Sequence, residues 1–234
     1  PFYTLPDLSW VKVITGAPEI GLINTLTGEE RLKTFEDFPM PAYDLLPMHL
    51  YKYEVLGPRF SLVETTRGCP YHCIFCSKVM GQEVYHMRKP SDIVDEVEYL
   101  HNSFGVKNIF FFDMEFCINK DHARQICNLL IERGVRVRWC MQSRVDTVSE
   151  ELLLLMKKAG LVLVQYGVES GNERVLELTK KGVTKQKIRD TFNLMKKYHV
   201  KSMAYFTIGN FKESEQEVFE TIEFAKELNP DYAS

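Results

Sequence analysis

Apolar and polar positions follow a regular order along the chain from residue 60 onward. Short apolar runs, which are typical of buried strands, are each followed by a segment whose apolar residues recur at helical spacing. The predicted strands span 60–65, 107–113, 136–142, 162–168 and 202–208, and a sixth begins near residue 231. Strands that alternate with helices through short connections predict a parallel α/β sheet with right-handed crossovers. Periodicity alone does not distinguish a closed barrel from a doubly wound sheet.

Local start and stop signals bound four of the predicted helices. Pro90 suits the first turn of a helix, and Gly105 suits the end of the same helix. Thr147 and Ser214 are each followed by a glutamate three residues later, a spacing that predicts a capping box. These signals predict helices over 90–104, 119–134, 147–160 and 214–228.

The segment before the alternating region is rich in proline and has no sustained periodicity, so we expect a connector that wraps over another surface. A short hairpin is predicted from residues 11–14 and 22–26. The prolines of this segment that favour an extended path are Pro39, Pro41 and Pro47. The aromatic residues expected to pack against the sheet are Phe35, Phe38 and Tyr43.

These patterns divide the chain into a wrapping segment, residues 1–57, and a core, residues 58–234. The chain opens with Pro1 and not with Met, and it stops where the sixth strand begins. We therefore expect a piece of a longer protein, with its core truncated near that strand.

Composition and charge narrow the classes of function. The chain has 234 residues, of which 45% are apolar, so it is long enough to bury one sizeable core. The net charge is −3 with no long block of one sign, which gives no electrostatic footprint for nucleic acid. No apolar run is long enough to cross a bilayer, and no signal peptide opens the chain. We expect a soluble, cytoplasmic protein with no membrane partner.

Three of the six cysteines lie close together, at Cys69, Cys73 and Cys76, directly after the first predicted strand. Thiolates at this spacing on one loop can face a single centre. Iron–sulfur clusters are normally held by four cysteine thiolates, so a set of three indicates an incompletely ligated cluster. A metal centre with an open position is usually built to bind a substrate. The remaining cysteines are expected to be core residues: Cys117, Cys127 and Cys140.

The stretch TTRGCPYHCIFC, with Phe75 before its last cysteine, resembles the signature of the radical S-adenosylmethionine (SAM) superfamily. GVESGNERVL at 167–176 and FEDFPMPAYDLLP at 35–47 resemble the subgroup whose members often carry an N-terminal cobalamin-binding domain. The resemblance implies a partial (β/α)6 barrel and a [4Fe–4S] cluster on the three cysteines. It also implies that SAM chelates the fourth iron and is cleaved reductively to a 5′-deoxyadenosyl radical.

In parallel α/β barrels the chemistry collects at the carboxyl ends of the strands. The resemblance implies that Asp113 or Glu115 receives the SAM amino group; a solvated carboxylate at a helix entry is the alternative. Ser143 and Arg144 suit the ribose hydroxyls and the methionine carboxylate, because arginine can grip a carboxylate with two parallel hydrogen bonds.

The later strand ends supply the remaining candidates. Gly167 allows close backbone approach. Glu169 resembles the family's ribose-contacting glutamate, and a helix N-terminal charge that complements the dipole is the alternative. Ile208 and Gly209 follow the strand that resembles the family's adenine-binding strand. Phe75 is expected to cover the adenine, with a simple core role as the alternative.

Three hypotheses about function remain open from the sequence. The first is a radical SAM enzyme whose full-length form binds cobalamin, most often a methyltransferase. The second is a radical SAM cyclase, oxidoreductase or methylthiotransferase that does not methylate. The third is a non-catalytic zinc or electron-transfer module, in which His72 would be a further ligand. For the first two we expect a small-molecule substrate and an electron donor such as ferredoxin or flavodoxin.

Overall fold

A six-stranded parallel sheet organises the fold, in a computed structural model that describes residues 39–76 and 85–234. The strand order is β10-β9-β8-β7-β6-β3, so β3 and β10 form the two edges and the sheet is not closed. Its strands are β3 (Phe60–Val63), β6 (Asn108–Phe111), β7 (Arg138–Ser143), β8 (Leu161–Glu169), β9 (Lys201–Phe206) and β10 (Tyr232–Ala233). The predicted parallel α/β sheet is confirmed as an open, partial barrel.

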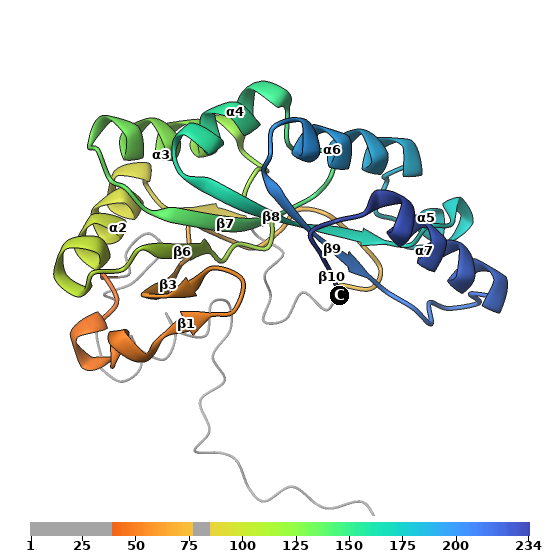
Figure 1. Ribbon diagram of the computed structural model, residues 1–234, viewed down its shortest axis with the longest axis horizontal. Helices are drawn as coiled ribbons and strands as arrows, with labels where there is room; N and C mark the ends of the chain where they lie inside the picture. Colours follow the sequence, from red (N-terminus) through yellow and green to blue (C-terminus); the bar gives the residue numbers. More distant parts are fainter. Residues whose placement is uncertain (1–38, 77–84) are drawn as a thin grey trace, which may run out of the picture.

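Helices follow the strands and lie along one face of the sheet. They are α2 (Pro90–Phe104), α3 (Lys120–Glu132), α4 (Glu150–Lys158), α5 (Glu173–Leu178), α6 (Lys185–Lys197) and α7 (Glu215–Leu228). Figure 1 shows α2, α3, α4 and α6 side by side on the outer face of the sheet, with the segment that contains β1 below the opposite face. Within the described ranges, no helix has both the length and the apolar character that a bilayer crossing requires.

The helix ends show where local signals decide and where they do not. Helix α2 ends as predicted, because Gly105 adopts the left-handed conformation at its C-cap (φ 64°). The capping box of α7 is also confirmed, with Ser214 and Glu217 bonded to each other's backbone. The capping box predicted at Thr147 is wrong. Ser149 caps α4, whose last residue is Lys158 and not Gly160.

The larger of two apolar clusters fills the space between the sheet and its helices. Phe111, Trp139 and Tyr166 are completely buried there, and the Trp139 indole N–H donates to the Ala159 carbonyl at 2.9 Å. A smaller cluster lies on the opposite, inner face. Its buried members are Leu56, Phe60, Phe110, Cys140, Leu163 and Met203. The antiparallel pair β1 (Lys52–Tyr53) and β2 (Gly57–Pro58) closes this end of the inner face.

The segment before the sheet packs against the core, as expected for Tyr43. Its ring is buried, and its hydroxyl donates to Glu96 at 2.5 Å, while Arg88 pairs with the same carboxylate. Two short 3₁₀ turns, η2 (Tyr43–Leu45) and η3 (Met48–Leu50), interrupt the extended path. The predicted hairpin over 11–14 and 22–26, and Phe35 and Phe38, lie outside the described residues. The division at residue 57 stays a prediction.

Candidate functional site

The cysteine loop leaves the carboxyl end of β3, at the edge of the sheet where parallel folds place their chemistry. Two short strands, β4 (Thr66–Arg67) and β5 (His86–Met87), pair antiparallel and hold the loop near its base. On its far side, the Ile74 N–H donates to the Thr179 carbonyl at 3.1 Å. The thiols of Cys69, Cys73 and Cys76 border one cavity of about 210 Å³.

Asp113 anchors the start of this loop from the end of β6. One carboxylate oxygen accepts the backbone N–H groups of Thr65 and Thr66 at 2.8 and 2.5 Å, and the other accepts the Thr65 hydroxyl at 2.9 Å. Burial raises the pKa of Asp113 to about 6, although these hydrogen bonds favour the ionised form. Asp113 does not line the cavity. Its bonding is that of a structural clamp.

Glu115, two residues further on, does line the cavity. It accepts hydrogen bonds from the hydroxyls of Ser143 and Thr147, at 2.8 and 3.1 Å, and from the backbone N–H groups of Cys117 and Arg144. Burial raises the pKa of Glu115 to about 7, so its charge responds to any cation brought into the cavity. Thr147 is therefore part of the site and not of a helix cap.

Arg144 connects the cysteine loop to the segment after α5. Its guanidinium makes two 2.9 Å hydrogen bonds to Asp146 and a third, of 2.6 Å, to the Lys181 carbonyl. The Tyr71 ring lies 4.0 Å from the same guanidinium, and the Cys73 sulfur is 3.9 Å from Nη1. Most of the Arg144 donors are thus engaged within the protein.

A buried ion pair forms the other side of the cavity. Lys181 Nζ lies 2.6 Å from Glu169 Oε1 and donates to the Gly167 carbonyl at 2.7 Å, and Thr207 donates to the second Glu169 oxygen at 3.1 Å. Glu169 has a left-handed backbone (φ 69°) where the β8–β9 register shifts. Such a conformation is unfavourable for a residue with a Cβ and often marks a functional site.

The structure brings most of the predicted site residues to one cavity. Those that line it are Cys69, Cys73, Phe75, Cys76, Glu115, Ser143, Arg144, Gly167 and Glu169. Asp113, Ile208 and Gly209 are outside its lining, and the Ile208 side chain is 59% exposed. The cavity residues that sequence reasoning missed are Tyr71, Met114, Gln142, Gln165, Lys181 and Tyr205.

The missed residues carry different amounts of local signal. Gln165 interrupts an apolar strand, and a buried amide within a strand is a signal that could have been used. Lys181 follows Lys180, which is exposed, and nothing in the sequence distinguishes the two ammonium groups.

The donor set fits an iron–sulfur cluster with three protein ligands. Burial raises the pKa of the Cys69 thiol, with a further contribution from the neighbouring Cys73 and Cys76, and bound iron would stabilise the thiolate. Over residues 39–76 and 85–234, no three potential ligands are gathered at metal-binding distances.

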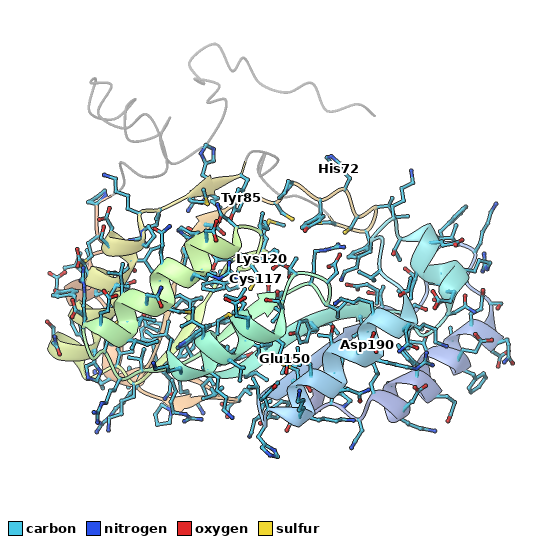
Figure 2. The ribbon with its side chains drawn as sticks, turned by 90° about the horizontal axis from the view of Figure 1, so that it is seen from above. His72, Tyr85, Cys117, Lys120, Glu150 and Asp190 are labelled. Carbon is cyan, nitrogen blue, oxygen red and sulfur yellow. The ribbon has the colours of Figure 1, made fainter. Side chains whose placement is uncertain are left out.

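His72 and the other three cysteines are not part of the cavity lining, although Cys117 is bonded to Glu115 and Cys140 accepts from Gln165. His72 is exposed on the outer side of the loop, and Figure 2 shows it well apart from Cys117. Cys117 is completely buried, as are Cys127 and Cys140, which confirms the expectation that these three are core residues.

Comparisons with known proteins agree with this geometry. The radical SAM superfamily matches residues 63–225. The chain is 37% identical over 204 residues to an uncharacterized methyltransferase of Pyrococcus horikoshii, covering 86% of this chain and 44% of that protein. It is 32% identical to the anaerobic magnesium-protoporphyrin IX monomethyl ester cyclase of Cereibacter sphaeroides, covering 83% of this chain and 32% of that protein. The chain thus spans less than half the length of these relatives.

Among solved structures, the radical SAM methyltransferase TsrM from Kitasatospora setae, with tryptophan and a SAM analogue bound, has the same fold. The TM-score is 0.69 at 19% sequence identity, over 75% of this chain and 35% of that chain. At this identity the likeness concerns the fold, which is the partial barrel described above.

Proposed function

This chain belongs to the radical SAM superfamily, and we propose that it is the catalytic core of a cobalamin-dependent, methyltransferase-like enzyme. As a radical SAM enzyme it uses a [4Fe–4S] cluster and SAM. When bound, these two groups supply reductive cleavage of SAM to a 5′-deoxyadenosyl radical, chemistry that belongs to the cofactors and not to the protein. The protein supplies ligands, orientation and a dry cavity.

The observation that carries this proposal is that three thiols, and three only among the described residues, border the cavity that also contains Glu115 and Glu169. Cys69, Cys73 and Cys76 would hold three irons and leave the fourth to SAM. The protein groups that face SAM would then come from the carboxyl ends of β6, β7 and β8.

Position relative to the cavity supports distinct roles for the two acidic residues that follow β6, Asp113 and Glu115. We assign the SAM amino group to Glu115 because it borders the cavity, whereas Asp113 lies outside the lining and is bonded to Thr65 and Thr66. An ammonium group near Glu115 would lower its raised pKa and favour the carboxylate.

Two further assignments follow from the contacts. Glu169 is held by Lys181 and Thr207, so that its remaining acceptor sites would receive the ribose hydroxyls. Arg144 has its guanidinium occupied by Asp146 and Lys181, so we assign it to positioning the cysteine loop and give it no carboxylate contact. The adenine-facing roles of Phe75, Ile208 and Gly209 stay predictions.

Methyl transfer is supported by the relative from Pyrococcus horikoshii and by the fold of TsrM, a structure of which contains cobalamin and a [4Fe–4S] cluster. A second candidate is a cyclase-type reaction without methyl transfer, supported by the 32% identity to the anaerobic cyclase. In either case we propose a small-molecule substrate and an electron donor such as ferredoxin or flavodoxin. The cytoplasmic location stays a prediction.

The test uses the full-length protein, reconstituted with iron and sulfide under anaerobic conditions. We expect about four irons per chain and formation of 5′-deoxyadenosine when SAM and dithionite are added. Zinc in place of iron, or iron without 5′-deoxyadenosine, would contradict the proposal. SAM with an isotopically labelled methyl group, given together with cobalamin and candidate substrates, separates the two reactions. Label in the product indicates methyl transfer, and an unlabelled product indicates the cyclase-type reaction.

A further inference from the structure

The inner face of the sheet is built in layers, because every second side chain of a strand points to the same side. Near the β1–β2 pair, the inner layer is apolar and consists of Phe110, Cys140, Leu163 and Met203. One step closer to the cysteine loop, the same strands place Gln142, Gln165 and Tyr205 on the same face. These three side chains line the cavity that the cysteines border. They form its floor, opposite the loop.

The floor is polar but uncharged. The Tyr205 hydroxyl donates to the Gln165 carbonyl oxygen, and the Gln165 amide donates to the Cys140 sulfur at 3.6 Å, a weak acceptor. Gln165 is only 1% exposed, so its second amide hydrogen has no access to bulk water. Burial raises the pKa of the Tyr205 phenol, which therefore keeps its proton at neutral pH.

The charged side chains of this cavity lie higher, toward the cysteine loop, and each has a protein partner. Glu115 is bonded to Ser143, and Lys181 is paired with Glu169. Arg144 is paired with Asp146. The floor therefore offers hydrogen bonds to a ligand, but it has no charged side chain that could neutralise a charged ligand.

An apolar shelf continues from this floor along the same inner face. Phe112 is 54% exposed and Leu62 is 47% exposed, although each lies on or directly beside a strand of the sheet. Phe112 packs edge-on against Phe110, with the ring centroids 5.4 Å apart. Both exposed side chains border a second cavity of about 720 Å³, whose charged lining residues are paired with one another, Arg67 with Glu64 and Arg88 with Glu96. Large apolar side chains exposed inside a concave face are typical of ligand sites.

We propose that this inner face is the substrate subsite, and that it binds an uncharged hydrogen-bonding group, such as an amide, carried on an apolar or aromatic body. The uncharged group would contact Gln142, Gln165 and Tyr205, and the body would lie on Phe112 and Leu62. The inference rests on the proposed function, which places the reaction in the adjoining cavity. A buried amide or hydroxyl is favourable only when it is hydrogen-bonded, and a buried charge costs far more without a partner. The floor therefore selects against carboxylates and ammonium groups.

The experiment compares three probes of matched size: benzamide, benzoate and benzylammonium. Binding to the anaerobically reconstituted protein with saturating SAM is measured by ligand-observed NMR. We expect benzamide to bind at least about tenfold more tightly than either ion, since each unmatched hydrogen bond or charge costs about tenfold or more. The variants Gln165→Met and Tyr205→Phe should each weaken benzamide binding by about tenfold.

Two control variants change the same residue types elsewhere. Gln186→Met removes an exposed amide on α6 that is bonded to Asp190, which Figure 2 shows far from the cysteine loop. Tyr99→Phe removes a partly exposed hydroxyl on α2. Both controls should leave benzamide binding unchanged.

The proposal is overturned if either ion binds as tightly as benzamide, if none of the probes binds, or if the floor variants behave like the controls. This outcome is separate from that of the proposed function, because the binding assay requires no cleavage of SAM. A protein that binds benzamide selectively and yields no 5′-deoxyadenosine would contradict the proposed function alone. Formation of 5′-deoxyadenosine without selective binding would contradict only the subsite.

Discussion

The outer face of the six-stranded sheet is packed against helices, whereas its inner face carries a small apolar cluster, an uncharged polar floor and exposed apolar side chains. Phe111 and Phe112 are neighbours in the chain and point to opposite faces. Phe111 is completely buried between Phe116 and Trp139, and Phe112 is 54% exposed.

The difference between the two faces separates stability from function within single strands. Close-packed side chains on the outer face contribute burial free energy and tolerate little change in volume. Side chains on the inner face leave polar groups and apolar area available to a ligand. A substitution on the outer face should therefore change the free energy of unfolding, and one on the inner face or the cysteine loop should change binding or turnover.

The sharpest test of this separation uses two cysteines. Cys73→Ala should abolish cluster binding and 5′-deoxyadenosine formation, because two thiols are too few to hold the cluster, and should change stability little. Cys127 is a buried residue of α3, so the Cys127→Ala variant should keep the cluster, and its free energy of unfolding should be lower by about 1 kcal/mol. Iron content and denaturant unfolding measure both effects. Retention of four irons by Cys73→Ala would contradict the site.

The two adjacent phenylalanines give the next largest effect. Phe111→Ala should lower the free energy of unfolding by about 3–5 kcal/mol, since it leaves a cavity in the packed core. Phe112→Ala should lower it by less than about 1 kcal/mol, because its ring is already half in water. Urea unfolding of the two variants measures the difference. Equal losses would show that the inner face is as closely packed as the outer one.

The free energy of unfolding should depend on pH through Glu115, the carboxylate that borders the cavity. The pKa of Glu115 is raised from 4.5 to about 7, so the folded protein holds a proton there that the unfolded chain releases. Its contribution to stability is present below pH 4.5 and is lost as the pH rises toward 7. The loss is about 3 kcal/mol, from a shift of 7 − 4.5 = 2.5.

Glu115→Gln should remove this decline, and thermal or urea unfolding between pH 4.5 and 7.5 measures it as the difference between wild type and variant. Glu151, an exposed residue of α4, provides the control substitution Glu151→Gln. An identical pH slope in wild type and Glu115→Gln would show that Glu115 stays ionised throughout, held by its four donors.

The smallest effect concerns the two hydroxyls near the start of α4. Ser149→Ala should lower the free energy of unfolding by about 1 kcal/mol, because the Ser149 side chain accepts from the Leu152 N–H at the N-terminus of the helix. Thr147→Val should instead raise the pKa of Glu115 further, because it removes a hydrogen bond to the ionised form. Unfolding titrations at several pH values separate the two outcomes.

The sequence predicted those features whose causes are local. Helix α2 has its predicted bounds because Pro90 and Gly105 act within one turn of its ends. The cysteine loop was identified because its chemistry depends on residue type and spacing. Strand ends were located to within two residues, since each apolar run is bounded by polar residues.

The remaining features depend on contacts between distant segments. Thr147 matches a capping box in sequence, but its hydroxyl is taken by Glu115 and the Arg144 carbonyl, so Ser149 caps the helix instead. Asp113 and Glu115 differ in role only because one faces the threonines of the cysteine loop and the other faces the cavity. The floor formed by Gln142, Gln165 and Tyr205 requires three strands in register, which periodicity does not fix.

Gly167 determines how this pocket can be redesigned. A methyl group on its α-carbon would lie 2.4 Å from both Lys181 Nζ and Glu169 Oε1, which are the ends of side chains and not backbone. A larger side chain at residue 167 would therefore separate the Glu169 carboxylate from the Lys181 ammonium group and weaken this ion pair. Attempts to widen this pocket for larger molecules should begin at Tyr205, which lines it, and leave Gly167 unchanged.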